Sequence, residues 1–460
     1  MSFTSDESRW ADVWIAAAAR GTTICGDFLA ATALALALQG AGAGGLAVSG
    51  LLLAATLPLV VLAPLAGRLA DRVDSRTLLV TIGFGQATIC ALLAVVEQPV
   101  LVVGLVALLA CGLAVTQPCL AALLPTMVRR ADLPRASAIS QTAVSLGALG
   151  GPVLAGLLVG QFGTRVPLLL DAVTYLALVV AGLLLRTRRG GRRPAASSPA
   201  AASSPAAAAG SRAVSGGVTT AGGTGIDWRL RRDPLMLVMV VSTAVVIAAI
   251  GGINVIEVFF IRETLGGSPT TYGLVSAAWM AGMLPGSWLA VRLARRLDDD
   301  GALVRGVLVT LAVCSLMVLF AATVPAAGVL VPLWLVGGAA NGGDNVFANI
   351  LLARRVPEAM RARAYASFGA AVQGGSMAGF LVGGALLAVV PPRPLIAGTG
   401  VVGLLVVLAF VPVVSRAVRG SSSAGLATPG RPAEPEPAAG DTVGPWLSAS
   451  NARGSGTSSS

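Results

Sequence analysis

The chain has 460 residues, of which 55% are hydrophobic and only 12% charged, about half the charged share of an ordinary soluble domain. Its mean hydropathy is +0.83, and at roughly 20 apolar residues per crossing the composition allows at most about twelve membrane spans. A soluble globular protein is excluded.

Two residue types, histidine and lysine, are missing from the chain. There is no histidine, and all 32 basic residues are arginines. Histidine-based nucleophile triads, histidine-ligated metals and histidine proton relays are therefore excluded. The five cysteines lie in apolar stretches without CxxC spacing and are interpreted as buried apolar side chains. We expect no enzymatic activity, no metal and no cofactor.

The apolar runs predict an all-α membrane protein with twelve transmembrane helices. The first run is too long for the apolar part of a cleavable signal peptide. In chain order the runs cover 13–38, 46–66, 77–96, 100–124, 138–160, 167–185, 235–258, 270–291, 303–324, 328–353, 364–390 and 394–414.

Changes in composition divide the chain into two six-helix bundles. A segment rich in Ala, Ser, Pro and Gly between the runs cannot bury enough apolar surface to order itself. The expected organisation is an N-terminal segment 1–12, a bundle 13–185, a flexible linker 186–234, a second bundle 235–414 and a disordered tail 415–460.

Arginine counts predict the orientation. The loops after spans 2, 4, 8 and 10 carry thirteen arginines, and the loops on the other side carry three. By the positive-inside rule we expect a multi-pass protein of the plasma or inner membrane, with both termini and the linker in the cytoplasm. Because the arginines cluster in these loops, the net charge of +11 does not indicate binding to nucleic acid. We expect the protein to be a monomer.

An internal repeat supports two matched halves. The run from Arg68 to Arg72, followed by Arg76, recurs from Trp288 to Arg292, followed by Arg296, at an offset of 220 residues. Parallel copies of a six-span unit predict a pseudo-twofold axis along the membrane normal, with a cavity between the halves near the midplane. This arrangement is typical of transporters.

Two motifs carry a family resemblance. The stretch Gly67–Arg76, GRLADRVDSR, resembles the loop 2–3 signature G-x-L-A-D-R-x-G-R-K/R of the major facilitator superfamily, from which it departs at Asp74 and Ser75. The stretch Gly147–Gly156 resembles the G-x-x-x-G-P-x-x-G-G motif that marks antiporters, with Ala155 in place of one glycine. The resemblance implies the fold of that superfamily, two six-helix pseudo-symmetric bundles.

Further runs are similar to the twelve-span drug:proton antiporter branch typified by macrolide-efflux proteins and the enterobactin exporter. They are Arg20 with Gly26 and Asp27, then 117–128, 151–163 and 341–357. The resemblance implies a proton-coupled exporter of a hydrophobic or amphipathic small molecule, such as a macrolide-like drug, a siderophore or another natural product. Its partners would be that molecule, protons and the lipid bilayer.

Acidic residues inside the apolar runs each need an explanation, because an ionisable group in the bilayer costs at least ~2.5 kcal/mol. Asp27 lies seven residues after Arg20, two helical turns along the same face and about 10.5 Å along the axis. It is interpreted either as a proton carrier or as part of a structural ion pair. Asp171, near the expected outer end of span 6, is interpreted as a capping or packing carboxylate. Glu257, close to Asn254, is either a gate or substrate-contact acid or an interfacial one.

Span 10 carries a polar stripe on an otherwise apolar helix. It consists of Asn341, Asp344, Asn345 and Asn349, at i, i+3, i+4 and i+8. Such groups would be poorly satisfied in lipid, so the stripe faces either a cavity or a partner helix.

The two motifs predict gating and packing roles. The resemblance implies a latch that holds the halves together on the cytoplasmic side in the outward-facing state. It would be formed by Gly67, Asp71, Arg72 and Arg76, with Arg292 and Arg296 in the second copy. The alternative is that these arginines only set the topology. Val291 replaces the acid in the second copy, so only the first latch is expected to work. Gly147, Gly151, Pro152 and Gly156 permit close helix approach and a kink, or simple small-residue packing.

Two alternatives to export remain open. One is a nutrient or metabolite importer of the same fold, against which the 5% aromatic content argues. The other is a non-transporting membrane scaffold or sensor that uses the linker or tail as a binding segment.

Overall fold

The structure, a computed structural model, describes residues 8–187, 233–297 and 299–426, with a few side chains inside these ranges left out. Residues 1–7, most of the predicted linker (188–232) and the tail from 427 lie outside the described residues. Every regular element in the described part is a helix.

The N-terminal half is built from seven helices. They are α1 (Trp10–Gly40), α2 (Gly45–Val61), α3 (Ala63–Arg72), α4 (Ser75–Leu93), α5 (Pro99–Met127), α6 (Leu133–Phe162) and α7 (Arg165–Leu184). Leu62 separates α2 from α3, after Pro58 within α2 and before Pro64 in the first turn of α3.

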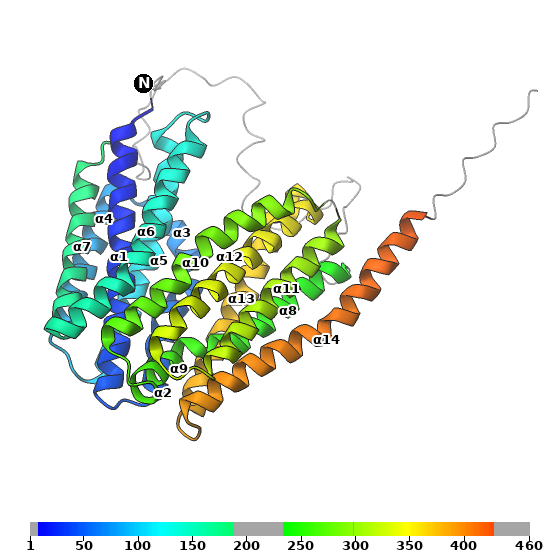
Figure 1. The fold of residues 1–460 in the computed structure, drawn as a ribbon. Coiled ribbons are helices and arrows are strands. Elements are labelled where there is room, and N and C mark those ends of the chain that lie inside the picture. Colours follow the sequence, from blue (N-terminus) through cyan, green and yellow to red (C-terminus); the bar gives the residue numbers. More distant parts are fainter. Residues whose placement is uncertain (1–7, 188–232, 298, 427–460) are drawn as a thin grey trace, which may run out of the picture. The chain divides into compact units, whose positions relative to one another are not determined.

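The C-terminal half follows the undescribed segment. Its elements are α8 (Pro234–Gly251), α9 (Ile253–Phe259), a π-helical turn (Phe260–Thr264), α10 (Pro269–Ala294), α11 (Asp300–Ala321), α12 (Leu330–Arg355), α13 (Glu358–Leu386) and α14 (Pro392–Leu426). Helix α14 extends past residue 414, where the apolar run ends. Figure 1 shows both groups of helices.

Within the described residues, nine helical stretches are long and apolar enough to cross a membrane, one of them the continuous stretch Leu235–Thr264. The α2–α3 pair, α12 and α13 are not among these nine stretches. Helix α2 alone has only 17 residues, and α12 carries the polar stripe of span 10, which lowers its hydropathy.

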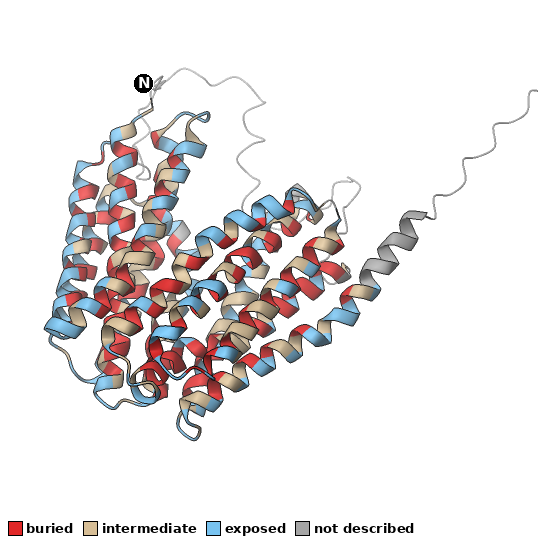
Figure 2. Ribbon diagram, in the orientation of Figure 1, coloured by how far each residue is buried: buried red, intermediate tan, exposed pale blue. Residues whose placement is uncertain are grey.

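Large apolar side chains are found on outward faces as well as in the core. Figure 2 shows buried and exposed residues alternating around the helices. Leu184 on α7 is 58% exposed and Leu408 on α14 is 63% exposed. Extended exposed apolar surface is unusual for a soluble protein and is what lipid-facing helices require.

The halves meet at glycines related by the internal repeat. A Cβ on Gly156 of α6 would lie 3.1 Å from the Cα of Gly273 on α10, and one on Gly384 of α13 would lie 2.6 Å from the carbonyl oxygen of Gly45 on α2. The two pairs are offset by the same 228 residues (384 minus 156, and 273 minus 45). The two contacts are thus equivalent under the pseudo-twofold symmetry that the repeat predicts.

Among the described residues, the hydrogen bonds between the halves lie toward one end of the helices. Gln39 Nε2 donates to Glu263 Oε1 at 3.1 Å, and Thr270 Oγ1 donates to the Gly156 carbonyl at 3.3 Å. We call this the closed end. The other end, where α1 and α8 begin, is called the arginine-rich end because it carries Arg72, Arg76, Arg292 and Arg355.

Candidate functional site

A cavity of about 330 Å³ lies between the halves. This volume is at the lower end of the 300–1,000 Å³ typical of small-molecule sites. The N-terminal half supplies mainly apolar side chains, including Phe28 and Leu52. Most polar groups come from the C-terminal half: Asn254, Glu257, Tyr272, Ser276, Trp334, Asn341 and Ser376.

Glu257 on α9 is the acidic side chain of this wall. It is 8% exposed, and Trp334 of α12 and Ser276 of α10 lie beside its carboxylate. Its Oε1 atom has no hydrogen-bond partner among the described residues. Asn254, three residues earlier, also lines the cavity, and its Nδ2 donates to the Gly251 carbonyl at 3.2 Å.

Aromatic rings surround the same part of the wall. The rings of Trp279 and Trp334 lie edge to face, with centroids 6.4 Å apart and an interplanar angle of 69°. Gly337 makes room for this arrangement, because a Cβ there would lie 2.7 Å from the Trp279 ring. Tyr272 completes the group. No sequence pattern singles out these three rings, because they are spread over two helices.

A second acidic cluster lies inside the N-terminal half, between α1, α4 and α7. The Tyr175 hydroxyl donates to Asp27 Oδ1, and the Cys90 thiol donates to Asp171 Oδ2 at 3.1 Å. Thr174 Oγ1 donates to Asp171 Oδ1 at 3.1 Å. Asp27 is partly buried, and it is not among the residues that line the cavity.

Gly26 explains how Asp171 reaches α1. A Cβ on Gly26 would lie 2.1 Å from Asp171 Oδ1, so only glycine leaves space for this carboxylate against the helix. Asp171 is fully buried. Its position near a helix end predicts a capping or packing group, and this position alone does not predict the contact with α1. The glycine next to Asp27 was the available signal.

Arg20 and Asp27 have separate partners. Arg20 Nη1 donates to Ser140 Oγ of α6 at 3.3 Å, whereas Asp27 is held by Tyr175. Among the described residues no ion pair joins Arg20 to Asp27, so the structural ion pair considered for these two residues is not formed here.

The polar stripe of α12 divides between three surroundings. Asn341 lines the cavity, and Asp344 is 2% exposed with no partner for Oδ1 in the described part of the chain. Asn345 and Asn349 are exposed and donate from Nδ2 to the carbonyls of residues 341 and 345 on their own helix. The stripe is about 140° wide at 100° per residue, so its four residues lie in different surroundings.

The Gly67–Arg76 motif lies at the arginine-rich end, where α3 packs against α2 and α5 of its own half. Arg72 and Arg76 have no ion-pair partner within the described residues. The side chain of Asp71 and the surroundings of Gly67 lie outside what the structure describes. In the second copy, Arg292 stacks on the Trp288 ring at 3.7 Å, and Arg296 is exposed.

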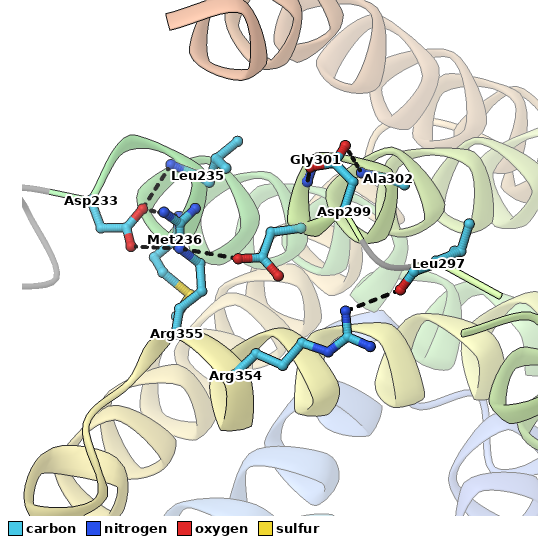
Figure 3. Close-up of polar contacts among 10 residues, drawn as sticks. Asp233, Leu235, Met236, Leu297, Asp299, Gly301, Ala302, Arg354 and Arg355 are labelled. Carbon is cyan, nitrogen blue, oxygen red and sulfur yellow. Dashed lines mark hydrogen bonds and ion pairs between the residues drawn. The ribbon is translucent and has the colours of Figure 1, made fainter. Parts of the chain in front are cut away.

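An ion-pair cluster joins three helices of the C-terminal half at the arginine-rich end (Figure 3). Arg355 Nε lies 3.1 Å from Asp233 Oδ2 and 3.7 Å from Asp300 Oδ2. Asp233 also caps α8 by accepting from the backbone of Leu235 and Met236. The sequence predicts only a topological role for Arg355 and places Asp233 in the linker, because their contact depends on the fold.

The glycines of the antiporter-like motif form two contacts. A Cβ on Gly147 would lie 2.2 Å from the Gly21 carbonyl oxygen, and one on Gly151 would lie 2.6 Å from that of Cys25, both on α1. Gly156 faces α10 of the other half, and Pro152 lines the cavity. The motif therefore connects the helix that carries Asp27 to the contact between the halves.

The family follows from comparison with known proteins. A family described as transmembrane secretion effector matches residues 6–425, which is most of the chain. The chain belongs to this family of major facilitator superfamily transporters. Comparison with curated proteins gives no match.

Solved structures share the fold of this transmembrane secretion effector. A mutant of the nucleoside transporter NupG superposes with a TM-score of 0.68 at 15% identity, over 88% of this chain and 99% of that one. A bacterial homologue of the lysosomal transporter Spinster, inward-facing and unoccupied, gives 0.61 at 13% identity, over 91% and 98%. An inward-facing bacterial homologue of the iron transporter ferroportin gives 0.62 at 16% identity, over 90% and 100%.

These findings confirm the predicted fold class, an all-α membrane protein with the major facilitator fold. The transmembrane secretion effector is a multi-pass secondary transporter of small molecules and not an enzyme.

Proposed function

We propose that the protein is a proton-coupled exporter, an antiporter that moves a hydrophobic or amphipathic small molecule out of the cell. It would belong to the drug:proton antiporter branch and act as a monomer in the plasma or inner membrane, with both termini in the cytoplasm.

The observation that carries this proposal is the carboxylate pair Asp27 and Asp171. Their hydrogen-bond partners are a phenol, a thiol and a hydroxyl, and none of these carries a positive charge. Ionisable groups inside a membrane bundle are costly and are functional by default. Two neighbouring carboxylates without a cation are suited to take up a proton from one side and release it when the halves rearrange.

The position of the contacts between halves supports a cycle of alternating access. With the termini in the cytoplasm, as proposed, the closed end would face outward and this conformation would be an inward-facing one. An exporter loads its substrate in that state. The arginines of the Gly67–Arg76 motif would then pair across the halves only after the arginine-rich end closes, as the resemblance implies for the outward-facing state.

Transport in proteoliposomes tests the proposal. Vesicles are loaded with an amphipathic dye, a macrolide or a catecholate in parallel, and the outside is made acidic. The expected result is efflux that is faster than without a pH gradient and that is lost when a protonophore is added. If no compound of the panel responds to the gradient while the reconstituted protein remains monodisperse, proton coupling is wrong.

A further inference from the structure

The cavity contains one charge. Among the described residues that line it, Glu257 is the only charged side chain, and no arginine reaches the wall. A carboxylate in a mostly apolar, water-poor site is stable only when a proton, a cation or several donors neutralise it. The substrate site therefore favours a positive charge and disfavours a negative one.

The surroundings of Glu257 leave a place for that charge. Its Oε1 atom is buried and has no partner in the described part of the chain, although Ser276 and Trp334 lie beside the carboxylate. The buried, unpartnered oxygen belongs to a residue that lines the cavity. A cationic group of a ligand would satisfy an acceptor that the protein leaves open.

The neighbouring rings favour the same charge. Trp279, Trp334 and Tyr272 line the cavity together with Glu257. Aromatic faces attract cations, most strongly where water is excluded. The opposite wall, with Phe28, Ala35 and Leu52 of the N-terminal half, offers apolar surface for the body of the ligand.

The two paired acids of the N-terminal half are not part of this site. Asp27 accepts from Tyr175 between α1 and α7, and Asp171 accepts from Cys90 of α4. Neither carboxylate is among the cavity-lining residues.

We propose that the cavity binds lipophilic monocations with Glu257 as their counter-ion, and that this site is separate from the Asp27–Asp171 pair. The substrate class rests on the transport function proposed above. Because the proton and the substrate charge occupy different halves, they would be linked by the rearrangement of the halves and not by competition for one carboxylate.

Binding of two ions of matched shape tests this proposal without any gradient. Radiolabelled tetraphenylphosphonium, a cation, and tetraphenylborate, an anion of nearly the same size, are titrated onto the full-length protein in detergent. We expect the wild type to bind the cation at least tenfold more tightly than the anion. Equal affinity for both ions, or no binding of the cation, would overturn the proposal, and neither result requires a variant to fold.

Variants locate the charge that is recognised. Glu257→Gln is expected to weaken binding of the cation at least tenfold, and Glu257→Asp, which keeps the carboxylate, less. Asp27→Asn, and Glu97→Gln at an exposed acid paired with Arg165, are expected to bind within twofold of the wild type. The proposal is wrong if Glu257→Gln binds the cation normally, or if Asp27→Asn loses binding as strongly as Glu257→Gln.

The binding and transport experiments together distinguish the proposed substrate class from the proposed proton coupling. If the cation fails to bind but a neutral amphipathic dye is still expelled by the pH gradient, the substrate class is wrong and the antiporter stands. If the cation binds through Glu257 but no compound responds to the gradient, the binding site stands and proton coupling is wrong.

Discussion

The two halves hold their acidic side chains in different surroundings. Asp27 and Asp171 of the N-terminal half are enclosed among α1, α4 and α7, where a phenol, a thiol and a hydroxyl contact them. Glu257 of the C-terminal half lines the cavity beside tryptophan rings. The helical framework is repeated in both halves but the positions of these three acids are not, as the proposed division between proton transfer and substrate binding requires.

The largest effect is expected from the N-terminal half. Replacing Asp27 with Asn removes a carboxylate from the pair, so pH-driven efflux should fall to the level of protein-free vesicles. Expression and size-exclusion profile should not change, because the amide still accepts from Tyr175. Glu97→Gln, which changes an exposed acid, is the control and should transport normally. Full activity of the Asp27 variant would remove this residue from the mechanism.

The contact between the halves gives the next largest effect. A Cβ on Gly156 would lie 2.6 Å from the Pro269 carbonyl oxygen, and one on Gly384 would lie 2.6 Å from that of Gly45. Alanine at either position should therefore weaken closure at this end and lower the efflux rate severalfold. Gly150→Ala, whose Cβ would make an ordinary 3.8 Å contact with the Cys25 sulfur, should have no effect. Unequal effects of the first two substitutions would argue that the pseudo-symmetric contacts are not equivalent in function.

The carboxylate pair is expected to act as a unit. Asp171→Asn alone should reduce pH-driven efflux partially, and the double variant with Asp27→Asn should be no worse than Asp27→Asn alone. Residues that act together show such non-additive effects. Initial efflux rates of the two single variants and the double variant form the required cycle. Asp171→Asn with wild-type efflux would restrict the role of Asp171 to packing.

The smallest effect concerns stability at the arginine-rich end. Replacing Arg355 with Gln leaves Asp233 and Asp300 without their shared cation and should destabilise the C-terminal half by about 1.5–3 kcal/mol, as for hydrogen bonds to charged groups. Arg305→Gln, which breaks an exposed pair with Asp299 at 3.5 Å, should cost no more than ~1 kcal/mol. Thermal unfolding in detergent compares the two. Equal melting temperatures would contradict the role of the cluster.

The fold could be predicted because its signals are local and repeated. Each apolar run and each arginine-rich loop is recognised within a short stretch of the chain. The Arg68–Arg76 stretch is likewise short, and its copy recurs at a fixed offset. The polar residues of α12 could be recognised for the same reason. Their division among three surroundings could not, because it depends on which helices pack against each side of the stripe.

The surroundings of the acids could not be predicted. Tyr175 lies 148 residues from Asp27, and Asp171 reaches α1 only because Gly26 has no side chain. The sequence does not decide between the three roles considered for Glu257, because its neighbours Ser276 and Trp334 come from other helices. No spacing rule connects such residues before the helices are packed.

Proton movement measured during transport tests the central claim most directly. Proteoliposomes that enclose the pH indicator pyranine are supplied with a transported dye from outside, so that entry of the dye by antiport drives protons out. The account predicts substrate-dependent alkalinisation of the lumen with the wild type and none with Asp27→Asn. Dye entry without a proton signal in the wild type, or an unchanged signal in the Asp27 variant, would contradict it.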